Sequence, residues 1–353
     1  MIFWDRLLAK HLGEPEIEFA AEYLKVAMSL PRKFQALVAT EAGLGVEAFE
    51  FDDLDAGDVV VDVKYSALNF KDSLAANGNP GVARKLPLIP GIDAVGEVLE
   101  SSDARYSVGQ QVLVGHADFG TSHHGAMAEL VRVPGEWVYP LPDGFDLRTT
   151  VAWGTAGFTA AQSVEKIVAH GVKPDDGEVL VTGATGGVGI FAVKLLAKLG
   201  YQVVASTGKQ ERYDWLTQNG ACEILTRQDL DDLSGKPMLK SRWSAAVDTV
   251  GGNTLSTVLR STVPYGCVTA CGLVAGHDLS ITVYPFILRG ITLCGISSAL
   301  VPRESRIRLW SNIAQQWSMD LDSIVNEISL NELPAAIDQI SNGSIAGRTI
   351  IKM

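Results

Sequence analysis

The glycine-rich stretch TGATGGVG, residues 182–189, holds the residues whose types and spacing most directly indicate chemistry. The apolar run EVLV precedes it, and the run IFAVKLLAKLG, which reads as a helix, follows it. Glycine lets a pyrophosphate approach the backbone, and the free N–H groups at the start of a helix attract negative charge. Gly186 would permit a tight turn and Gly189 close packing of helix on strand, in a GxGxxG spacing with Ala184 in the first position. The stretch predicts a dinucleotide site, with an ordinary glycine turn as the alternative.

The next apolar run, YQVVAST, ends where a dinucleotide enzyme contacts the ribose of its cofactor. Enzymes that prefer NAD place an Asp or Glu there to accept from the 2′-hydroxyl group. This chain has Ser206, Thr207 and Lys209 instead, whose donors and positive charge would favour a 2′-phosphate. We therefore expect NADPH rather than NADH. The alternative is that Lys209 and Arg212 are solvated residues in the first turn of a helix.

Two kinds of pattern must position these residues. Short β-rich runs such as DVVVDVKYSAL and GIDAVGEVLES, separated by Gly, Pro and Asp turns, predict a mostly β domain from residue 34 to about 139. Apolar strands alternate with helical stretches from 155 to about 289, which predicts a doubly wound parallel sheet. The tail from 291 adds the strand ITLCGI, a helix over 306–317 and two strand-like ends. The expected fold class is α/β.

The composition limits the class of partner. At 353 residues the chain is long enough for two domains, because single cores stop growing at roughly 250–300 residues. A formal net charge of −12 argues against nucleic acid and against an anionic membrane surface, which leaves a small-molecule substrate as the expected partner. There is no apolar run of about 18 residues and no cleavable signal pattern, so we expect a cytoplasmic protein. The four cysteines lie mostly in apolar runs such as GCVTACGL and are expected to be buried thiols.

Residues 1–33 read as an amphipathic helical extension that is too acidic for a mitochondrial presequence. A partner-binding helix is one interpretation. An accessory segment, or a start codon upstream of a true start at Met28, is the other.

Nine strings in order, from Phe34 to Met353, carry a resemblance to a known family. They are SALNFKDSLA, PLIPGIDAVGEV, GTAGFTAAQSV, DGEVLVTGATGGVG, KLGYQVVASTGK, DTVGG, CGLVAG, PFILRGITLCGISS and AGRTIIKM. The chain resembles the medium-chain dehydrogenase/reductases, in the zinc-independent quinone oxidoreductase branch that includes AcuI-type acrylyl-CoA reductases and YhdH-type quinone oxidoreductases. The resemblance implies a GroES-like catalytic domain over 34–153 and 291–353 and a Rossmann NADPH-binding domain over 154–290.

The resemblance also implies the residues that bind the cofactor. The pyrophosphate would lie on Thr185, Gly186, Gly187, Val188 and Gly189, and the 2′-phosphate near Ser206, Gly208 and Lys209. The remaining matches are Arg227 at the adenosine end, Leu273, Ser298 and Arg348 from later strands and the tail, and Ser73 and Thr159 near the nicotinamide. Leu273 could instead be a core residue, and Arg348 could cap a sheet edge.

Zinc-dependent relatives place a Cys ligand early in the β domain and a His-Glu pair in a PGHE string. Asn69, Ile92 and Asp93 stand at the matching positions of this chain, and the four-cysteine structural lobe is missing. A catalytic zinc needs about three protein ligands, so no metal is expected. His123 and His124 form a loop pair with no third ligand at metal spacing.

Without metal or flavin, the implied chemistry is direct hydride transfer from the nicotinamide to an electron-poor carbon, such as the β-carbon of an α,β-unsaturated thioester. Negative charge then reaches the carbonyl oxygen, which needs donors. Asn69 and Lys71 are the candidate donors, and Asp72 would orient its neighbours. Lys71 could equally be a solvent-exposed lysine. Related enoyl-thioester reductases often use a Tyr where this chain has Phe70, so the proton donor stays unassigned.

The sequence leaves three functions open, two of them enzymatic and one of them binding alone. The expected function is reduction of an acrylyl-CoA-type enoyl thioester, with the basic residues Arg84-Lys85 and Arg303, Arg306 and Arg308 as candidates for the coenzyme A phosphates; a solvated helix face explains the second group equally well. A quinone or enone reductase, or a non-catalytic NADPH-binding redox sensor, are the alternatives. The resemblance further implies a homodimer, formed near ITLCGI, where an edge strand would otherwise be exposed.

Overall fold

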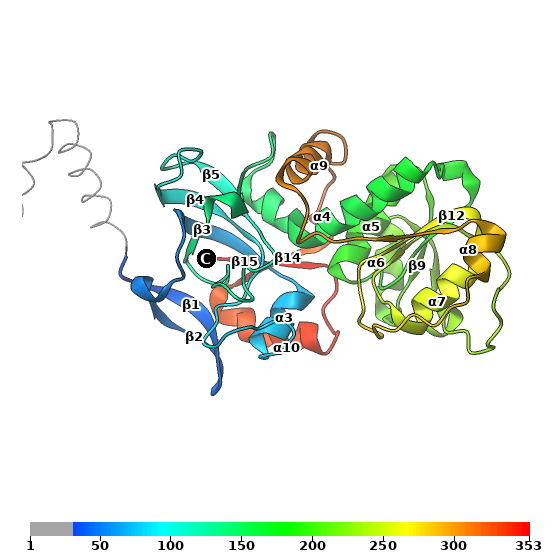
Figure 1. The fold of residues 1–353 in the computed structure, drawn as a ribbon, viewed down its shortest axis with the longest axis horizontal. Coiled ribbons are helices and arrows are strands. Elements are labelled where there is room, and N and C mark those ends of the chain that lie inside the picture. The colour runs from blue at the N-terminus through cyan, green and yellow to red at the C-terminus, as the bar shows by residue number, and fades with distance from the viewer. Residues whose placement is uncertain (1–30) are drawn as a thin grey trace, which may run out of the picture.

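The computed structural model describes residues 31–353, which form two large sheets and a two-stranded sheet, with helices around them and between them (Figure 1). The expected helical extension over 1–33 falls almost entirely outside the described residues. A mostly β domain, at the left of Figure 1, contains the C-terminus, and a parallel α/β domain lies at the right. The predicted α/β class is confirmed.

The mostly β domain is a seven-stranded sheet in the order β14-β15-β3-β4-β5-β7, with β6 paired to β3. Its strands are β3 (Val59–Leu68), β4 (Ala94–Ser101), β5 (Gln111–Val114), β6 (Leu130–Val133), β7 (Val138–Pro140), β14 (Val325–Ser329) and β15 (Arg348–Lys352). A hairpin of β1 (Lys33–Thr40) and β2 (Gly43–Glu50) and the helices α3 (Phe70–Ala76) and α10 (Leu333–Ser341) complete it. Since β15 pairs with β3, the end of the chain returns to the first domain.

The second domain is a six-stranded, fully parallel sheet in the order β10-β9-β8-β11-β12-β13. Its strands are β8 (Glu178–Val181), β9 (Gln202–Ser206), β10 (Ala221–Leu225), β11 (Trp243–Asp248), β12 (Thr262–Ala270) and β13 (Thr292–Gly295). The helices are α5 (Gly187–Lys198), α6 (Tyr213–Gln218), α7 (Gly252–Ser261) and α8 (Tyr284–Arg289). Counted within this domain, the order is that of a dinucleotide-binding sheet, whose strand order reverses between β8 and β11.

The expected domain boundary at residue 291 places the strand ITLCGI in the mostly β domain, and the strand pairing corrects this. Val268 of β12 pairs with Leu293 of β13 in the parallel sheet, so the strand belongs to the nucleotide-type domain. We propose 34–153 and 296–353 as the extent of the mostly β domain. Periodicity alone could not assign this strand, because a short apolar strand fits either sheet.

The long helix α4 (Leu147–His170) joins the two domains and bends at Gly154, where φ is 43° and ψ is −154°. A side chain could not be added there, since a Cβ on Gly154 would lie 2.3 Å from Nη2 of Arg348 and 2.6 Å from Oδ2 of Asp93. Glycine at this bend therefore provides both the backbone conformation and the space for those two side chains.

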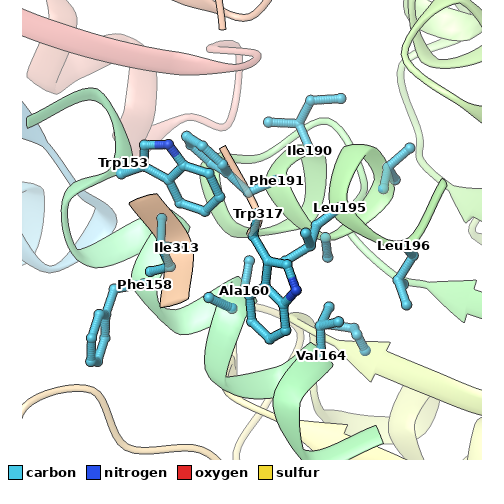
Figure 2. Packing of buried hydrophobic residues seen from close by; sticks show 14 of the residues in the cluster. Trp153, Phe158, Ala160, Val164, Ile190, Phe191, Leu195, Leu196, Ile313 and Trp317 are labelled. Carbon is cyan, nitrogen blue, oxygen red and sulfur yellow. The ribbon is translucent and has the colours of Figure 1, made fainter. Parts of the chain in front are cut away.

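One apolar core runs across the junction. Trp153 of α4 lies against Phe191 of α5 with ring centroids 4.8 Å apart, and Phe158 lies 5.6 Å from Trp310 of the helix α9 (Arg303–Gln315). Figure 2 shows these α4 and α5 side chains with Ile313 and Trp317 in one continuous packing. The two domains thus share buried surface rather than meeting through a flexible linker.

Short 3₁₀ turns occur at Phe51–Asp53, Gly135–Trp137, Pro174–Asp176, Gln210–Arg212, Gln228–Leu230 and Leu330–Glu332. None of the helices in the described part of the chain has the length and apolarity needed to cross a bilayer. All four cysteines are free thiols, and the expectation that they are buried holds for Cys267 but is wrong for Cys222, which is exposed.

Candidate functional site

The glycine loop leaves the carboxyl end of β8 and enters α5, whose N-cap is Gly186. A Cβ on Gly189 would lie 2.3 Å from the carbonyl oxygen of Gly183, so glycine is required for the helix to lie against the turn. The left-handed residue of the turn is Gly183, with φ of 58°, whereas Gly186 has an ordinary φ of −76°. The tight turn runs from Gly183 to Gly186 and is closed by a hydrogen bond from the N–H of Gly186 to the carbonyl oxygen of Gly183 at 2.9 Å. The first N–H groups of α5 have no acceptor within the helix and face outward from the loop.

A buried carboxylate holds this loop at the point where the strand order reverses. Asp248, at the end of β11, accepts hydrogen bonds from Oγ1 of Thr182 at 2.7 Å and from the backbone N–H of Gly251 at 2.8 Å. Burial raises the pKa of Asp248. The string DTVGG alone does not predict this role for Asp248, because its partner Thr182 lies 66 residues earlier in the chain.

Three cationic side chains gather beyond the end of β9. Burial lowers the pKa of Lys209, with smaller lowering contributions from the nearby charges of Arg212 and Arg227. The guanidino group of Arg227 lies over Gly208, since a Cβ there would be 2.6 Å from its Nε. Among the described residues none of the three cations forms an ion pair; the Nζ of Lys209 donates to the carbonyl oxygen of Ile345. A cavity of about 580 Å³, with Arg212, Trp215, Ser344 and Ile345 in its wall, opens beside them.

The hydroxyl groups at the same strand end are buried. Ser206 donates to the carbonyl oxygen of Thr226 at 3.4 Å, and Oγ1 of Thr185 lies 3.2 Å from Oγ1 of Thr207. The glycine loop and the strand end are thus linked by a side-chain contact, and the cation cluster follows directly. This arrangement fits a pyrophosphate at the loop and an additional phosphate beside the cations.

The other residues implied by the family resemblance lie in different surroundings. Oγ of Ser73 donates to the carbonyl oxygen of Phe70, and Oγ1 of Thr159 donates to that of Thr155. Each hydroxyl group is therefore hydrogen-bonded within its own helix. Leu273 is exposed on the loop after β12, which argues against the core interpretation. The carbonyl oxygen of Ser298 accepts from Arg306.

Arg348 is the largest departure from the sequence interpretation, because it is buried at the centre of a hydrogen-bonded network and is only 1% exposed. Its Nη2 lies 2.8 Å from Oδ2 of Asp93, and its Nη1 donates to Oδ1 of Asn69 at 2.8 Å. The backbone carbonyl oxygens of Leu68 and Ala152 accept from the same guanidinium. Removing one partner of a buried ion pair leaves a charge without compensation, which typically costs about 3–5 kcal/mol.

Asp93 and Asn69 are held from several sides. Asp93 also accepts from the backbone N–H and from Oγ1 of Thr155, the latter at 2.6 Å. The Nδ2 of Asn69 donates to Oδ2 of Asp93 at 2.9 Å and approaches Oδ2 of Asp72 at 3.2 Å. The amide N–H₂ of Asn69 therefore has acceptors within the protein, which favours a positioning role over the donor role that the sequence predicts.

This network lies where zinc-dependent relatives have their ligands, according to the sequence match at Asn69 and Asp93. The guanidinium of Arg348 supplies a fixed positive charge to the carboxylate there. No group of three or more His, Cys, Asp or Glu side chains suited to a metal is found within residues 31–353. The donor set, an amide and one carboxylate already paired with arginine, does not fit a metal ion.

Lys71 and Asp72 begin α3 beside this network. Nζ of Lys71 donates to the carbonyl oxygen of Ala117 at 3.0 Å, and burial lowers its pKa, so it is not the solvent-exposed lysine of the alternative interpretation. Asp72 is completely buried, and its Oδ2 accepts from the backbone N–H of Asn69 at 2.7 Å, which agrees with an orienting role. Its Oδ1 has no partner among the described residues. Burial raises the pKa of Asp72 to about 7.

A small cavity lies next to the network, between the mostly β domain and the helices α4 and α9. Its wall includes Asp93, Gly115, Tyr139, Thr155 and Arg306. The cavity lies near the glycine loop. Thr155 is in its wall, and the next residue of α4, Ala156, contacts the loop, since a Cβ on Gly187 would lie 3.3 Å from Cβ of Ala156. The cavity is therefore the candidate site for the reacting part of a substrate.

His116 was missed by the sequence interpretation. It follows β5 and stacks on Trp137 with centroids 4.4 Å apart and an interplanar angle of 5°. Burial lowers its pKa, and the charges of Arg306 and Lys71 lower it further. His124 of the loop pair is structural, since its Nδ1 accepts from the backbone N–H of Ile89. Nothing in the strings GHADFG and TSHHG distinguishes His116 from His124.

The basic residues expected to bind coenzyme A do not form one surface. Lys85 is paired with Asp55 at 2.6 Å, and Arg84 with Asp118 at 3.4 Å. Arg303 donates to the carbonyl oxygen of Val138 at 2.7 Å and to Oη of Tyr106. Arg306 is buried, which leaves Arg308 as the exposed cation of its group. Arg303, Arg306 and Arg308 therefore do not share one environment, and Arg308 fits the solvated helix face of the alternative interpretation. Their burial depends on packing that the helical spacing does not reveal.

The comparisons with family models match both domains. An alcohol dehydrogenase GroES-like domain matches residues 55–143, and a zinc-binding dehydrogenase model matches residues 187–315. The first covers strands β3 to β7 of the mostly β domain, and the second begins at the first residue of α5.

Three relatives align over nearly their whole length. "Putative quinone oxidoreductase YhfP" of Bacillus subtilis is 42% identical over 91% of this chain and 99% of its own, and "Acrylyl-CoA reductase AcuI" of Ruegeria pomeroyi is 41% identical over 87% and 93%. The crystal structure of the yhdH oxidoreductase from Salmonella enterica in complex with NADP is 41% identical, covers 90% of this chain and 99% of that one, and has a TM-score of 0.87. The structure of Bacillus subtilis yhfP, solved with NAD bound, covers 92% and 100% with a TM-score of 0.87.

The raised pKa of Asp72 predicts a specific dependence of stability on pH. The protonated side chain is favoured in the folded state, so its stabilising contribution is complete below pH 4 and is lost as the pH rises towards 7. An Asp72→Asn variant lacks this loss. We expect the variant to gain up to roughly 4 kcal/mol relative to wild type between pH 4 and pH 8, measured as free energies of unfolding in urea.

Asp143→Asn, at an exposed aspartate, is the matched control and should follow the wild-type curve. Parallel curves for Asp72→Asn and wild type would mean that Asp72 keeps an ordinary pKa in the folded protein.

Three findings lead to one family. The glycine loop lies where the strand order of a six-stranded parallel sheet reverses, and the last strand of the chain pairs with the β domain. The relatives align over nearly their whole length. The chain belongs to the medium-chain dehydrogenase/reductases and is an oxidoreductase of the branch that contains YhfP and AcuI.

Proposed function

We propose that this protein reduces the carbon–carbon double bond of an α,β-unsaturated acyl thioester of the acrylyl-CoA class, using NADPH and no metal. The observation that carries the proposal is the Arg348–Asp93 ion pair beside the glycine loop, in which Asp93 stands at a position matched to a zinc ligand. An arginine-bound carboxylate cannot polarise a substrate as a zinc ion does, so the reaction needs an acceptor that is already electron-poor. The relation to AcuI, over 93% of its length, supports the thioester as that acceptor.

NADPH supplies the hydride when bound. Thr185 and the run Gly186–Gly189 would hold its pyrophosphate, and Ser206, Gly208, Lys209 and Arg227 its 2′-phosphate. Leu273, Ser298, Ser73 and Thr159 would line the rest of the site, as the family match implies, while Arg348 acts through Asn69 and Asp93. The unpaired cations around Lys209 support NADPH over NADH.

The protein's own residues would then orient and shield the reacting groups. The network around Asp93 fixes the start of α3 and the bend of α4 in one geometry. Trp310 and Phe158, whose ring centroids lie 5.6 Å apart, form an apolar part of the cavity wall.

A quinone or enone is the second candidate acceptor. The commitment of Lys85 and Arg303 to contacts within the protein favours it, because these cations are then not free for coenzyme A. Its chemistry is the same, since a conjugated carbonyl accepts the hydride in both cases.

Replacing Lys209 should change cofactor preference. We expect Lys209→Met to weaken NADPH binding about 10- to 100-fold, because a charge-assisted contact to phosphate is worth about 1.5–3 kcal/mol, and to leave NADH binding within about twofold. Calorimetric titration with both cofactors measures this. Lys166→Met, at an exposed position of α4, is the control, and an equal loss for both cofactors would refute the role of Lys209.

An acceptor panel tests the reaction. Purified protein treated with a chelator should oxidise NADPH when acrylyl-CoA is added, followed at 340 nm, with propionyl-CoA identified by mass spectrometry. A quinone should be reduced at least about tenfold less efficiently as kcat/KM, which corresponds to about 1.4 kcal/mol. Faster reduction of the quinone would select the second candidate, and NADPH binding without oxidation by any acceptor would indicate a redox sensor.

We also propose a homodimer formed through β13 and α8. The edge strand β13 leaves backbone N–H and C=O groups without a partner on one side. Exposed apolar side chains lie around it, among them Ile287 (68%) and Leu288 (64%) of α8 and Tyr265 (79%) of β12. The four free thiols fit a reducing compartment, and we propose the cytoplasm.

The dimer can be tested by placing a charge on this surface. We expect the wild-type protein to sediment as a dimer at micromolar concentration and Ile287→Arg to sediment as a monomer, because a buried unpaired charge is costly. Val108→Arg, at an exposed apolar position of the mostly β domain, should stay dimeric. A monomeric wild-type protein would exclude this interface.

A further inference from the structure

Arg306 is a buried cation without a carboxylate partner. It lies on α9 and is 7% exposed. Its Nη2 donates to the carbonyl oxygen of Ser298, and its Nε is buried and has no acceptor among the described residues. The guanidinium stacks 5.3 Å from the ring centre of Tyr139 and 5.0 Å from that of Phe158.

The other two arginines that are buried within residues 31–353 are fully compensated. Arg348 pairs with Asp93, and Arg260 pairs with Asp232 at 2.8 Å while donating to several carbonyl oxygens. Arg306 has no ion pair within residues 31–353, and burial lowers its pKa. A guanidinium that is desolvated and largely unpaired destabilises the folded state, and such groups concentrate at functional sites.

The side chain forms part of the wall of the small cavity, together with Asp93, Tyr139 and Thr155. The carboxylate of Asp93 already accepts from Arg348, Asn69 and Thr155 and cannot offer Arg306 a further close contact. The free donors of Arg306 are therefore available to a ligand. The cavity is small, which excludes a diphosphate and suits a single oxygen atom.

We propose that Arg306 binds the carbonyl oxygen of the acceptor and stabilises the negative charge that hydride transfer places on it. This inference rests on the proposed function. The nicotinamide C4 of NADPH gives its hydride, with both electrons, to the β-carbon, and the double-bond pair moves through the α-carbon to the carbonyl oxygen. The enolate then takes a proton from water at the α-carbon and restores the carbonyl, leaving NADP⁺ and the saturated product. Donors fixed in a desolvated site stabilise such an oxyanion strongly.

A thioester and a quinone both present a carbonyl oxygen conjugated to the carbon that accepts the hydride. The role of Arg306 is therefore the same for both acceptors, and only the part of the molecule beyond the carbonyl differs. The acceptor panel shows whether the protein reduces the thioester or the quinone.

The test compares Arg306→Met, Arg306→Lys and Arg308→Met. Methionine keeps an unbranched side chain between Tyr139 and Phe158, and Arg308 is exposed two residues further along the same helix. We expect Arg306→Met to lower kcat/KM for acrylyl-CoA about 100-fold, with the dissociation constant of NADPH unchanged. Arg306→Lys should recover part of the loss, and Arg308→Met should match wild type. Added guanidinium ion at millimolar concentration should partly restore Arg306→Ala.

Thermal stability separates this role from a structural one. If Arg306 serves the acceptor, Arg306→Met should keep or raise the Tm, because it removes a poorly compensated buried charge. A lower Tm together with weaker NADPH binding, or a kcat/KM within threefold of wild type, would overturn the inference. A wild-type protein that binds NADPH but oxidises it with none of the acceptors would instead refute the proposed function, and this inference with it. The acceptor panel shows this before any variant is made.

Discussion

The ion pair between Arg348 and Asp93 fixes the relative positions of segments that lie far apart in the sequence. Arg348 is the first residue of β15, Asp93 precedes β4, and the same guanidinium bonds to Asn69 before α3 and to the backbone of α4. The bend of α4 at Gly154 requires glycine, because the side chains of Arg348 and Asp93 occupy the space that a Cβ would need. The glycine loop, in turn, contacts the same helix at Ala156. Charge compensation at one buried point thus sets where the cofactor loop stands relative to the substrate cavity.

This arrangement also shows how one scaffold supports reactions with and without a metal. A zinc ion and an arginine are both positive, but the ion has open positions for a substrate, whereas this guanidinium has its donors taken by protein oxygens. The positive charge at Arg348 is therefore structural. A catalytic positive charge has to come from elsewhere, and Arg306 is a cation in the wall of the cavity.

The sequence was sufficient for the elements with a strong local pattern. The alternation of strands and helices predicted the parallel sheet, and the spacing around Gly189 predicted a loop whose close packing the structure contains. It was insufficient where the outcome depends on distant partners. Arg348 and Asn69 are 279 residues apart, and no periodicity indicates that they share a hydrogen bond. Arg303, Arg306 and Arg308 look alike in the sequence, yet one is tied to backbone oxygens, one is buried and one is exposed, because α9 packs one side against α4. The strand Thr292–Gly295 could not be assigned to a sheet for the same reason.

The apolar packing that continues from α4 into α5 and α9 has a consequence for how ligands enter and leave. Swinging the domains apart as rigid halves would expose Trp153, Phe158 and Phe191 to water at a large cost in free energy. Exchange of spent cofactor for fresh cofactor then has to proceed by local rearrangement of surface segments. The stretch from Ser344 to Gly347, which touches both Lys209 and Thr185, is the part whose displacement would free the nucleotide while the shared interior stays closed.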